Sequence, residues 1–357
     1  MAVHLLLGTN KGAFILDGGA DRDGWRLRGP FCETWPINHV VGEPESGAIL
    51  AGGGTRWHGV GVWRSDDLGE SWRCSGAGLS YPEEDDEEVE TVWSLGGADG
   101  RLLAGVKPAG LFESRDGGAT WSEVTGLRGH PSRQDWMPGG AGLILHSIVP
   151  QPDDPARLWV GISAAGVFAT EDGGQSWEPR NAGTRCDFLP EGQRHPEVGQ
   201  CVHNLVHAAG PGEVLYQQNH CGMYRSDDGG RTWVSIENGL PSSFGFPVAA
   251  HPRDPRTVWL MPMNGDDAGR YPPEGRAAVW RSRDGGEIWQ DLRDGLPQDT
   301  AYFTVLRQAM AVDARAPAGV YFGTSSGSVF ASRDEGESWD EIARHLPLIL
   351  SVEVLDR

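Results

Sequence analysis

The chain has 357 residues, among them 52 glycines and 24 prolines, and its 30 basic and 50 acidic side chains give a formal net charge of −20. Fifteen tryptophans exclude a disordered chain, which is poor in aromatics, and the glycines follow no three-residue period, which excludes collagen. The negative charge argues against a nucleic-acid partner and against an anionic membrane surface, because both require a cationic protein face.

The N-terminal segment MAVHLLLGTN has no cationic start and only a short apolar run, which is not typical of a signal peptide. No apolar stretch approaches the roughly 20 residues of a membrane-spanning helix. The cysteines are odd in number and cannot all pair within one chain: Cys32, Cys74, Cys186, Cys201 and Cys221. These features predict reduced thiols and a cytoplasmic protein without a membrane partner.

In chain order, the predicted strands are short β-type runs, from HLLLGT (4–9) through LLAGV (102–106), LWVGI (158–162) and VLYQ (214–217) to GVYFGT (319–324). Between them recurs an octapeptide of the form Ser-x-Asp-x-Gly-x-Ser/Thr-Trp, with some variation. It occurs at residues 65–72, 114–121, 170–177, 226–233, 282–289 and 332–339, with a decayed copy at 17–25. Seven copies in 357 residues leave 51 residues for each unit. Each unit is therefore predicted to contain strand A, strand B, a turn, strand C, the octapeptide turn and strand D.

The two ends of the chain indicate how these units form a ring. The first unit lacks a strand A, and the last segment, LPLILSVEVL (346–355), matches a strand A with nothing after it. We expect Leu348–Leu355 to pair with Leu5–Thr9 as the inner strand of blade 1, which removes two open sheet edges. The predicted fold class is all-β: a seven-bladed β-propeller of four-stranded antiparallel blades, forming one domain over residues 1–357. Six blades are the alternative.

The octapeptide resembles the Asp-box, or BNR, repeat, and the chain resembles bacterial Asp-box propellers known as sialidase-like or glycosyl-hydrolase-like. The resemblance covers nearly the whole chain and implies the propeller fold, but one fold hosts many functions. In that family the box is a structural turn, which suits Asp and Ser oxygens that bond turn amides and a Trp that buries a large area. True sialidases carry an Arg-Ile-Pro segment near the first strand. HLLLGT has none, so sialidase activity is not expected.

The strand order divides the ring into two ends. In a meandering blade, the B–C turns and the D-to-A linkers lie at the end opposite the octapeptide turns, which we call the front face. The linkers at 76–90, 122–145 and 178–202 are long, and the B–C turn between Trp259 and Trp280 is expanded. Binding residues concentrate on such loops, so a ligand pocket is expected there.

Two histidines on this face occupy equivalent places. His146 and His203 lie 13 residues before Trp159 and Tyr216, at the start of the innermost strands of blades 4 and 5, and His39 is expected to hold the same place in blade 2. Histidines that converge on a channel mouth suit acid–base chemistry or metal binding. The predicted catalytic residues are His146, His203 and Glu197. The predicted metal ligands are His39, His146 and His203, with affinity falling below about pH 6.5 as imidazole protonates.

Further side chains on the same face are predicted to bind the ligand. They are Lys11, His39, His58, Lys107, Trp136, His220, Tyr302 and Arg307. The run Cys201-Val202-His203, with His207, His220 and Cys221, also offers metal-binding residue types, although its spacing matches no tight template. A single histidine at a strand start is more often a hydrogen-bonded structural residue.

Two functions remain open on these grounds. The first is a hydrolase or lyase acting on a small polar or carbohydrate-like molecule, with acid–base catalysis by His or Glu and with a divalent metal as the candidate cofactor. The second is a non-catalytic propeller that recognises a protein or a glycan. A deep pocket lined by His and carboxylates favours the enzyme, and a flat aromatic surface favours the partner.

Overall fold

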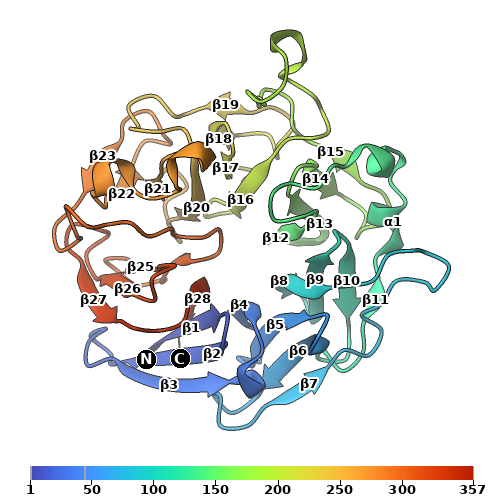
Figure 1. Cartoon of the computed structure of the whole chain (residues 1–357), viewed down its shortest axis with the longest axis horizontal. Helices are drawn as coiled ribbons and strands as arrows, with labels where there is room; N and C mark the ends of the chain where they lie inside the picture. Colours follow the sequence, from blue (N-terminus) through green and yellow to red (C-terminus); the bar gives the residue numbers. More distant parts are fainter. Residues whose placement is uncertain (1, 44–45, 357) are drawn as a thin grey trace.

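The computed structural model describes residues 2–43 and 46–356 and contains seven four-stranded antiparallel sheets arranged in a ring (Figure 1). From the central channel outward, blade 1 consists of β28 (Ile349–Asp356), β1 (Val3–Thr9), β2 (Gly12–Gly18) and β3 (Arg26–Phe31). Blade 2 consists of β4 (Ile37–Gly42), β5 (Ile49–Thr55), β6 (Gly59–Ser65) and β7 (Arg73–Ser75). Blade 3 consists of β8 (Thr91–Ala98), β9 (Arg101–Lys107), β10 (Leu111–Ser114) and β11 (Ser122–Glu123).

The remaining four blades repeat this order. Blade 4 consists of β12 (Leu145–Gln151), β13 (Asp154–Ile162), β14 (Gly166–Thr170) and β15 (Glu178–Pro179). Blade 5 consists of β16 (Val202–His207), β17 (Leu215–Asn219), β18 (Gly222–Ser226) and β19 (Val234–Ser235). Blade 6 consists of β20 (Gly245–Ala250), β21 (Val258–Pro262), β22 (Val279–Ser282) and β23 (Gln290–Leu292), and blade 7 of β24 (Met310–Val312), β25 (Val320–Gly323), β26 (Val329–Ser332) and β27 (Asp340–Ala343).

Helical segments are short and lie in the connections. They are α1 (Thr125–Arg128), η1 (Cys32–Thr34), η2 (Pro131–Asp135), η3 (Glu191–Gln193), η4 (Asp266–Ala268) and η5 (Pro273–Gly275). Within residues 2–43 and 46–356, none of the helices has both the length and the apolar character to span a lipid bilayer. The seven four-stranded sheets confirm the predicted seven-bladed propeller.

The C-terminal strand closes the ring as predicted. β28 pairs antiparallel with β1, from the Val3–Asp356 pair to the Thr9–Ile349 pair, and the two termini lie side by side in blade 1 (Figure 1). Just beyond the ladder, the backbone amide of Asn10 donates to the carbonyl of Leu348 at 3.2 Å. β1 is therefore paired on both sides and is not an open edge, and β28 takes the innermost place in the blade; Arg357 lies outside the described residues.

The octapeptides form tight turns between strands C and D. In the copy at 114–121, Asp116 accepts hydrogen bonds from the backbone amide of Thr120 at 2.9 Å and from its hydroxyl at 2.6 Å. The amide of Gly118 donates to the Ser114 hydroxyl at 2.9 Å, and Trp121 is buried in the core. The hydrogen bonds from Thr120 and Ser114 lower the pKa of Asp116 to about 2. These contacts all lie within the turn, so its role is structural.

Burial follows the position of a strand in its blade. The second strands are almost wholly buried, as in β9, where only Lys107 is partly exposed, because blades pack against neighbours on both faces. The outermost strands β3, β7 and β23 are largely exposed and polar. Strand-C aromatics such as Phe112 and Phe168 are fully buried between blades. The ring is therefore a rigid support for the loops at its ends.

Candidate functional site

A cavity of about 460 Å³ opens on the front face; we call it the front cavity. Each of its lining residues comes from a D-to-A linker, a B–C turn or the first residues of an innermost strand in blades 4 to 7. The lining residues are 137–141, Ser163, Ala164, Phe188, Leu189, Pro196, Val198, Gly199, Cys201, His203, His220, Phe246, Asp266, Arg270 and Arg307. Two of the three long linkers and the expanded turn of blade 6 thus build one pocket. The linker at 76–90 does not contribute to it.

The innermost strands of blades 2 to 6 carry a β-bulge or similar register irregularity near the front face, and these irregularities show which residues are equivalent in different blades. The register skips one residue between Leu145 and Ser147 in β12 and between Val202 and Asn204 in β16. His146 and His203 are therefore equivalent, as the 13-residue count predicted. In β4 the skip falls between Ile37 and His39, so the equivalent residue in blade 2 is Asn38. The place predicted for His39 is wrong by one residue, because the position of the bulge in β4 cannot be read from the residue spacing.

The bulge residues tie neighbouring blades together. A bulge leaves groups of the ladder unpaired, and a side chain from the preceding blade supplies the missing partner of a carbonyl. The bonds are Asn38 Nδ2 to Val92 O at 2.8 Å, His146 Nε2 to Val202 O at 2.9 Å and His203 Nδ1 to Gly245 O at 2.6 Å. The first structural task of both histidines is thus to connect adjacent blades.

The two histidines differ in what their second ring nitrogen does. Nδ1 of His146 is 3.0 Å from the hydroxyl of Ser147, so both nitrogens of this ring are engaged in the fold. His203 makes its hydrogen bond through Nδ1, and no partner is found for Nε2 in the described part of the chain. Its ring stacks on Phe246 with centroids 4.7 Å apart. His203 can therefore offer a lone pair to a ligand, whereas His146 cannot.

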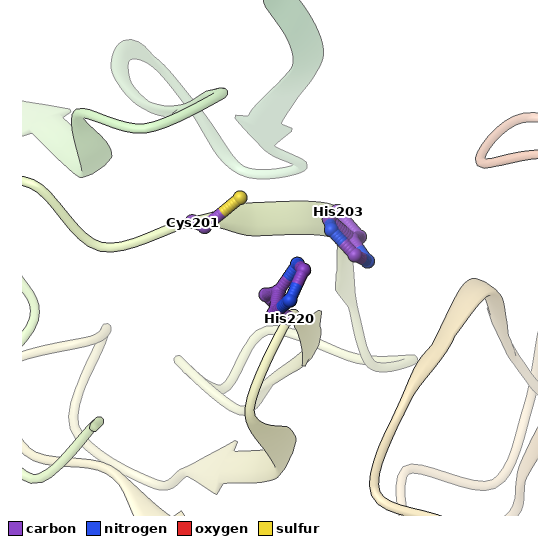
Figure 2. A group of neighbouring side chains, drawn as sticks. All are labelled: Cys201, His203 and His220. Atoms are coloured by element: carbon purple, nitrogen blue, oxygen red, sulfur yellow. The ribbon is translucent and has the colours of Figure 1, made fainter. Parts of the chain in front are cut away.

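Cys201 and His220 lie beside the ring of His203 (Figure 2). Cys201 comes two residues before His203, and His220 lies in the turn between β17 and β18, where its backbone amide donates to the carbonyl of Cys201 at 2.8 Å. The ligand atoms of the three side chains all lie within 4.8 Å of one another. Among the described residues, this is the one group of three or more His, Cys, Asp or Glu side chains placed to hold a metal ion.

The charges in the front cavity do not balance. Asp266 and Arg270 form an ion pair, with Oδ1 2.5 Å from Nε. The guanidinium of Arg307 lies 5.2 Å from the ring centre of Phe246, its Nε is closed to solvent, and within residues 2–43 and 46–356 it has no hydrogen bond or ion pair. Burial lowers the pKa of Arg307 to about 10, so the group stays cationic at neutral pH. The cavity thus holds one uncompensated positive charge in a protein of net charge −20.

Apart from the Asp266–Arg270 ion pair, the pKa shifts of His203, His220 and Cys201 in this cavity favour their neutral forms. Burial, assisted by the positive charge of Arg307, holds the pKa of His203 well below its ordinary value. Burial also lowers the pKa of His220, although the Asp266 carboxylate, 3.9 Å from Nε2, opposes the shift. Burial raises the pKa of the Cys201 thiol, and Arg307 opposes that change.

His39 and His146, two of the predicted metal ligands, lie elsewhere. Both line the central channel, a cavity of about 370 Å³ bordered by all seven innermost strands. Nδ1 of His39 accepts a hydrogen bond from the amide of Leu95 at 2.9 Å, and Nε2 is 3.4 Å from the Glu353 carboxylate. The structure therefore does not bring His39, His146 and His203 together around one ion. Of the three, only His203 lines the front cavity.

Of the other predicted site residues, His220 and Arg307 line the front cavity and six do not. Those six are Lys11, His58, Lys107, Trp136, Glu197 and Tyr302. Glu197 is exposed and accepts a hydrogen bond from the amide of Asn181 at 3.2 Å. Lys107 forms an ion pair with Glu90 at 3.0 Å. These contacts engage both side chains outside the front cavity.

The remaining four are placed by local packing. Trp136 is buried against Phe168, with ring centres 4.9 Å apart, and so belongs to the core. His58 is bonded to the hydroxyl of Thr55 in an exposed turn, and Lys11 is exposed in the turn between β1 and β2. Tyr302 is 69% exposed and packs on Tyr271. An aromatic or charged side chain in a front loop thus need not face the cavity.

Asp266, Arg270 and Phe246 line the front cavity and were not predicted to do so. Asp266 and Arg270 lie in the expanded turn of blade 6, whose length was the available signal. Phe246 lies 13 residues before Trp259 and is therefore the counterpart of His146 and His203 in blade 6. The 13-residue count thus gives the place of Phe246 in its blade, but not that an apolar ring at this place lines the cavity.

Comparisons with known proteins identify propeller relatives. No protein-family model matches the chain. The chain is 24% identical over 220 residues to an oligoxyloglucan-reducing end-specific xyloglucanase of Emericella nidulans, a match that covers 54% of this chain and 25% of that protein. It is 26% identical over 184 residues to a probable enzyme of the same name from Neosartorya fischeri, covering 50% of this chain and 19% of that protein. The chain thus spans about a quarter or less of the length of these relatives.

Solved structures agree on the fold. An ancestral GH74 enzyme superposes with a TM-score of 0.61 at 17% identity, over 86% of this chain and 38% of that one. The GH74 enzyme of Niastella koreensis gives 0.63 at 14% identity, over 98% and 51%. YCF48 bound to D1 peptide gives 0.54 at 16% identity, over 92% and 89%. None of these relatives is a sialidase. The chain is a seven-bladed β-propeller that is similar to xyloglucanases over part of their length.

Proposed function

We propose that the front cavity binds a small, polar, carbohydrate-like molecule that carries an acidic group, and that the protein acts on this molecule as a hydrolase. The observation that carries the proposal is the unpaired guanidinium of Arg307. A buried charge without a partner is unfavourable by several kcal/mol, and a counter-ion removes that cost. A carboxylate or phosphate suits this role, because its oxygens match the planar fork of a guanidinium.

Asp266 is the proposed acid–base group. It is the one carboxylate lining the front cavity in the part of the chain that the structure describes. Oδ1 is held by Arg270, while Oδ2 lies 3.9 Å from Nε2 of His220. Most glycosidases place two carboxylates on either side of the scissile bond, an arrangement that this cavity lacks. The chemistry proposed here therefore relies on Asp266, and it assigns no catalytic role to His146 or Glu197.

Binding tests the first half of the proposal. Titration calorimetry should detect glucuronate or glucose 6-phosphate and should show much weaker binding of glucose, which lacks the anion. Arg307→Met should weaken binding of the acidic sugars at least tenfold, because it removes a charge-assisted hydrogen bond. Arg276→Met, in the same region of blade 6 but exposed and paired with Glu274, is the matched control and should bind normally. Equal binding of glucose and glucuronate would contradict the proposal.

Turnover tests the second half. Nitrophenyl glycosides of an acidic sugar should release nitrophenol faster than those of the neutral sugar. Asp266→Asn should retain most of the binding and lose turnover, since it preserves shape and removes the titratable group. Binding without turnover of any acidic glycoside would leave a binding protein and refute the hydrolase.

A second candidate, recognition of a peptide at the same face, is favoured by the rim of the front cavity. Met137 and Phe188 are 67% and 58% exposed there, which is unusual for large apolar side chains. YCF48, whose structure contains a bound D1 peptide, is also a propeller of comparable length. In this reading Arg307 pairs with a peptide carboxylate. Binding of carboxylate-terminated peptides that Arg307→Met abolishes, without binding of acidic sugars, would favour this function.

A further inference from the structure

The geometry points to a second ligand of the front cavity: we propose that Cys201, His203 and His220 bind a transition-metal ion of the Zn²⁺ class. This inference goes beyond the proposed function, because it does not depend on which organic molecule the cavity accepts. It rests on three side chains whose ligand atoms lie within 4.8 Å of one another (Figure 2).

A single hairpin builds the whole site. Cys201 directly precedes β16, and His203 is the bulge residue near its start. His220 follows β17, and its amide bonds to the carbonyl of Cys201, so the two residues face each other across the hairpin. Val202 and Asn219, their neighbours, form a register pair. Strand pairing alone therefore brings the three ligands together.

The hydrogen bond of His203 decides which of its ring nitrogens is available to a metal ion. Its Nδ1 donates to the carbonyl of Gly245 at 2.6 Å, which fixes the tautomer with the lone pair on Nε2. Metal-binding histidines commonly make such a bond through the nitrogen that does not bind the metal. The rings of His203 and His220 meet edge to face, with centroids 5.3 Å apart. His146, the equivalent residue in blade 4, has both nitrogens engaged and so provides a built-in contrast.

The distances suit a tetrahedral ion after a small contraction. Zinc–sulfur and zinc–nitrogen bonds of about 2.3 and 2.0 Å place neighbouring ligand atoms roughly 3.3–3.7 Å apart. The observed limit of 4.8 Å therefore requires a closure of at most about 1.5 Å. The side chain of His220 is 28% exposed and lies in a turn, so it has room to move.

The ligand set also selects the ion. One thiolate and two imidazoles favour zinc and similar transition metals, whereas magnesium and calcium prefer oxygen ligands. Three protein ligands leave a fourth position open to the cavity, as in catalytic zinc sites. Arg307 lines the same cavity, so an anion bound there could contact both cations. On binding, the Cys201 thiol releases one proton to solvent, and its sulfur forms the bond to the metal.

The other front-face thiols are different. Sγ of Cys186 donates to the side-chain oxygen of Gln200 at 3.2 Å, and Sγ of Cys221 accepts from the amide of Asp187 at 3.2 Å. Neither belongs to the three-residue cluster. Cys221 is adjacent to His220 in the chain, which makes Cys221→Ser the matched control for Cys201→Ser.

Cobalt titration tests the site directly. Reduced protein, stripped of metal by a chelator, should bind one equivalent of Co²⁺ with a thiolate-to-cobalt charge-transfer band and the strong visible bands of a tetrahedral site. Zn²⁺ should displace the cobalt and raise the melting temperature, since it binds only the folded state. Absence of the charge-transfer band from the wild-type protein overturns the proposal, and this measurement requires no variant.

The variants then locate the site. Cys201→Ser should abolish the charge-transfer band, and His220→Gln should weaken cobalt binding at least tenfold, while Cys221→Ser retains both. A band that survives Cys201→Ser overturns the assignment. Arg307→Met, which tests the proposed function, should bind cobalt at least as tightly as wild type because it removes a nearby positive charge. Failure of acidic-sugar binding while cobalt still binds would contradict the proposed function alone. Failure of cobalt binding while acidic sugars still bind would contradict the metal site alone.

Discussion

His146 and His203 occupy the same bulge position in neighbouring blades, and their different hydrogen bonds give them different capacities. Each contributes one ring nitrogen to a carbonyl of the next blade. The second nitrogen of His146 is bonded to Ser147, while that of His203, a residue lining the front cavity, has no partner among the described residues. Although the two histidines occupy the same structural position, His146 serves only the fold, whereas His203 can also bind a ligand.

The buried state of His146 predicts a pH dependence of stability. Burial, followed by the charge of Arg307, places its pKa well below the ordinary value of about 6.5. The folded protein therefore binds fewer protons than the unfolded chain, so this contribution is complete above about pH 6.5 and is lost as the pH falls below it. Urea unfolding between pH 8 and pH 5 should measure this loss. His146 should lower the free energy of unfolding by up to about 1.4 kcal/mol for each pH unit below 6.5.

His146→Gln is the corresponding variant, because glutamine can still donate to the carbonyl of Val202 but does not titrate. It should be less stable than wild type at pH 8 and should lose less stability between pH 6.5 and pH 5. His58→Gln, at an exposed turn, should follow the wild-type curve. Parallel curves for His146→Gln and wild type would show that His146 does not control this dependence.

At the scale of the element, the octapeptide turn is a self-contained unit. The hydrogen bonds of its Asp and Ser side chains close within eight residues, as in Asp116 with Thr120 and Ser114 with Gly118. Contacts outside the turn come from backbone carbonyls, such as that of Gly229, which accepts a hydrogen bond from Arg180 at 2.9 Å, and from the final tryptophan. Trp233, for example, donates from its indole nitrogen to the carbonyl of Arg180 at 2.9 Å and packs in the core beside blade 4.

This arrangement predicts that the turns matter for stability and not for ligand binding. Trp233→Ala should lower the free energy of unfolding by roughly 3–5 kcal/mol, because it removes a large buried side chain and leaves a cavity. Binding at the front cavity should persist at temperatures where the variant is folded. Trp57→Ala is the control, since Trp57 is 89% exposed and its loss should be nearly neutral. A neutral Trp233→Ala with lost ligand binding would mean that the functional end of the ring is the other one.

The turn between β21 and β22 shows what an insertion adds to such a regular unit. It carries Asp266 and Arg270 over the front cavity, where no other blade supplies a carboxylate among the described lining residues. Arg270 lies 5.8 Å from the ring centre of Phe246, the residue at the bulge position of blade 6. The rigid strand and the inserted turn thus contribute opposite walls of one site.

At the scale of the whole molecule, the C-terminal strand decides whether the ring is closed. β28 pairs with β1 and lies beside β4 and β24, the innermost strands of the adjacent blades. Deletion of residues 346–357 should expose the edge of β1 and leave a gap in the channel wall. Such edges promote association between chains, so light scattering should detect aggregation of the truncated protein.

A circular permutant provides the control for this deletion. Because the termini lie side by side in blade 1, a short linker from residue 357 to residue 2, with new ends in the linker between blades 2 and 3, preserves every strand. It should remain monomeric, with a melting temperature close to that of wild type. A truncated protein that matches wild type in melting temperature and stays soluble would contradict closure by strand exchange.

The architecture could be predicted from the chain alone because its signals are local and repeated. The octapeptides, the strand-C aromatics and the unmatched strands at the two ends specify seven units and their closure, and each depends on residues within one unit. The same regularity located the front face and the equivalence of His146 and His203. It also indicated two of the long linkers and the inserted turn as the builders of a pocket.

The composition of the site depended on tertiary structure. Which loop side chains face the cavity is set by packing between blades 4, 5, 6 and 7, so Lys107 and Trp136 are engaged elsewhere while Asp266 lines it. The offset of His39 follows from a bulge that no periodicity reveals. The lone charge of Arg307 is visible only when its surroundings are known. Sequence determined the repeated scaffold, because its contacts recur within each unit. Only the assembled ring decided the chemistry, because the site joins residues that no single unit contains.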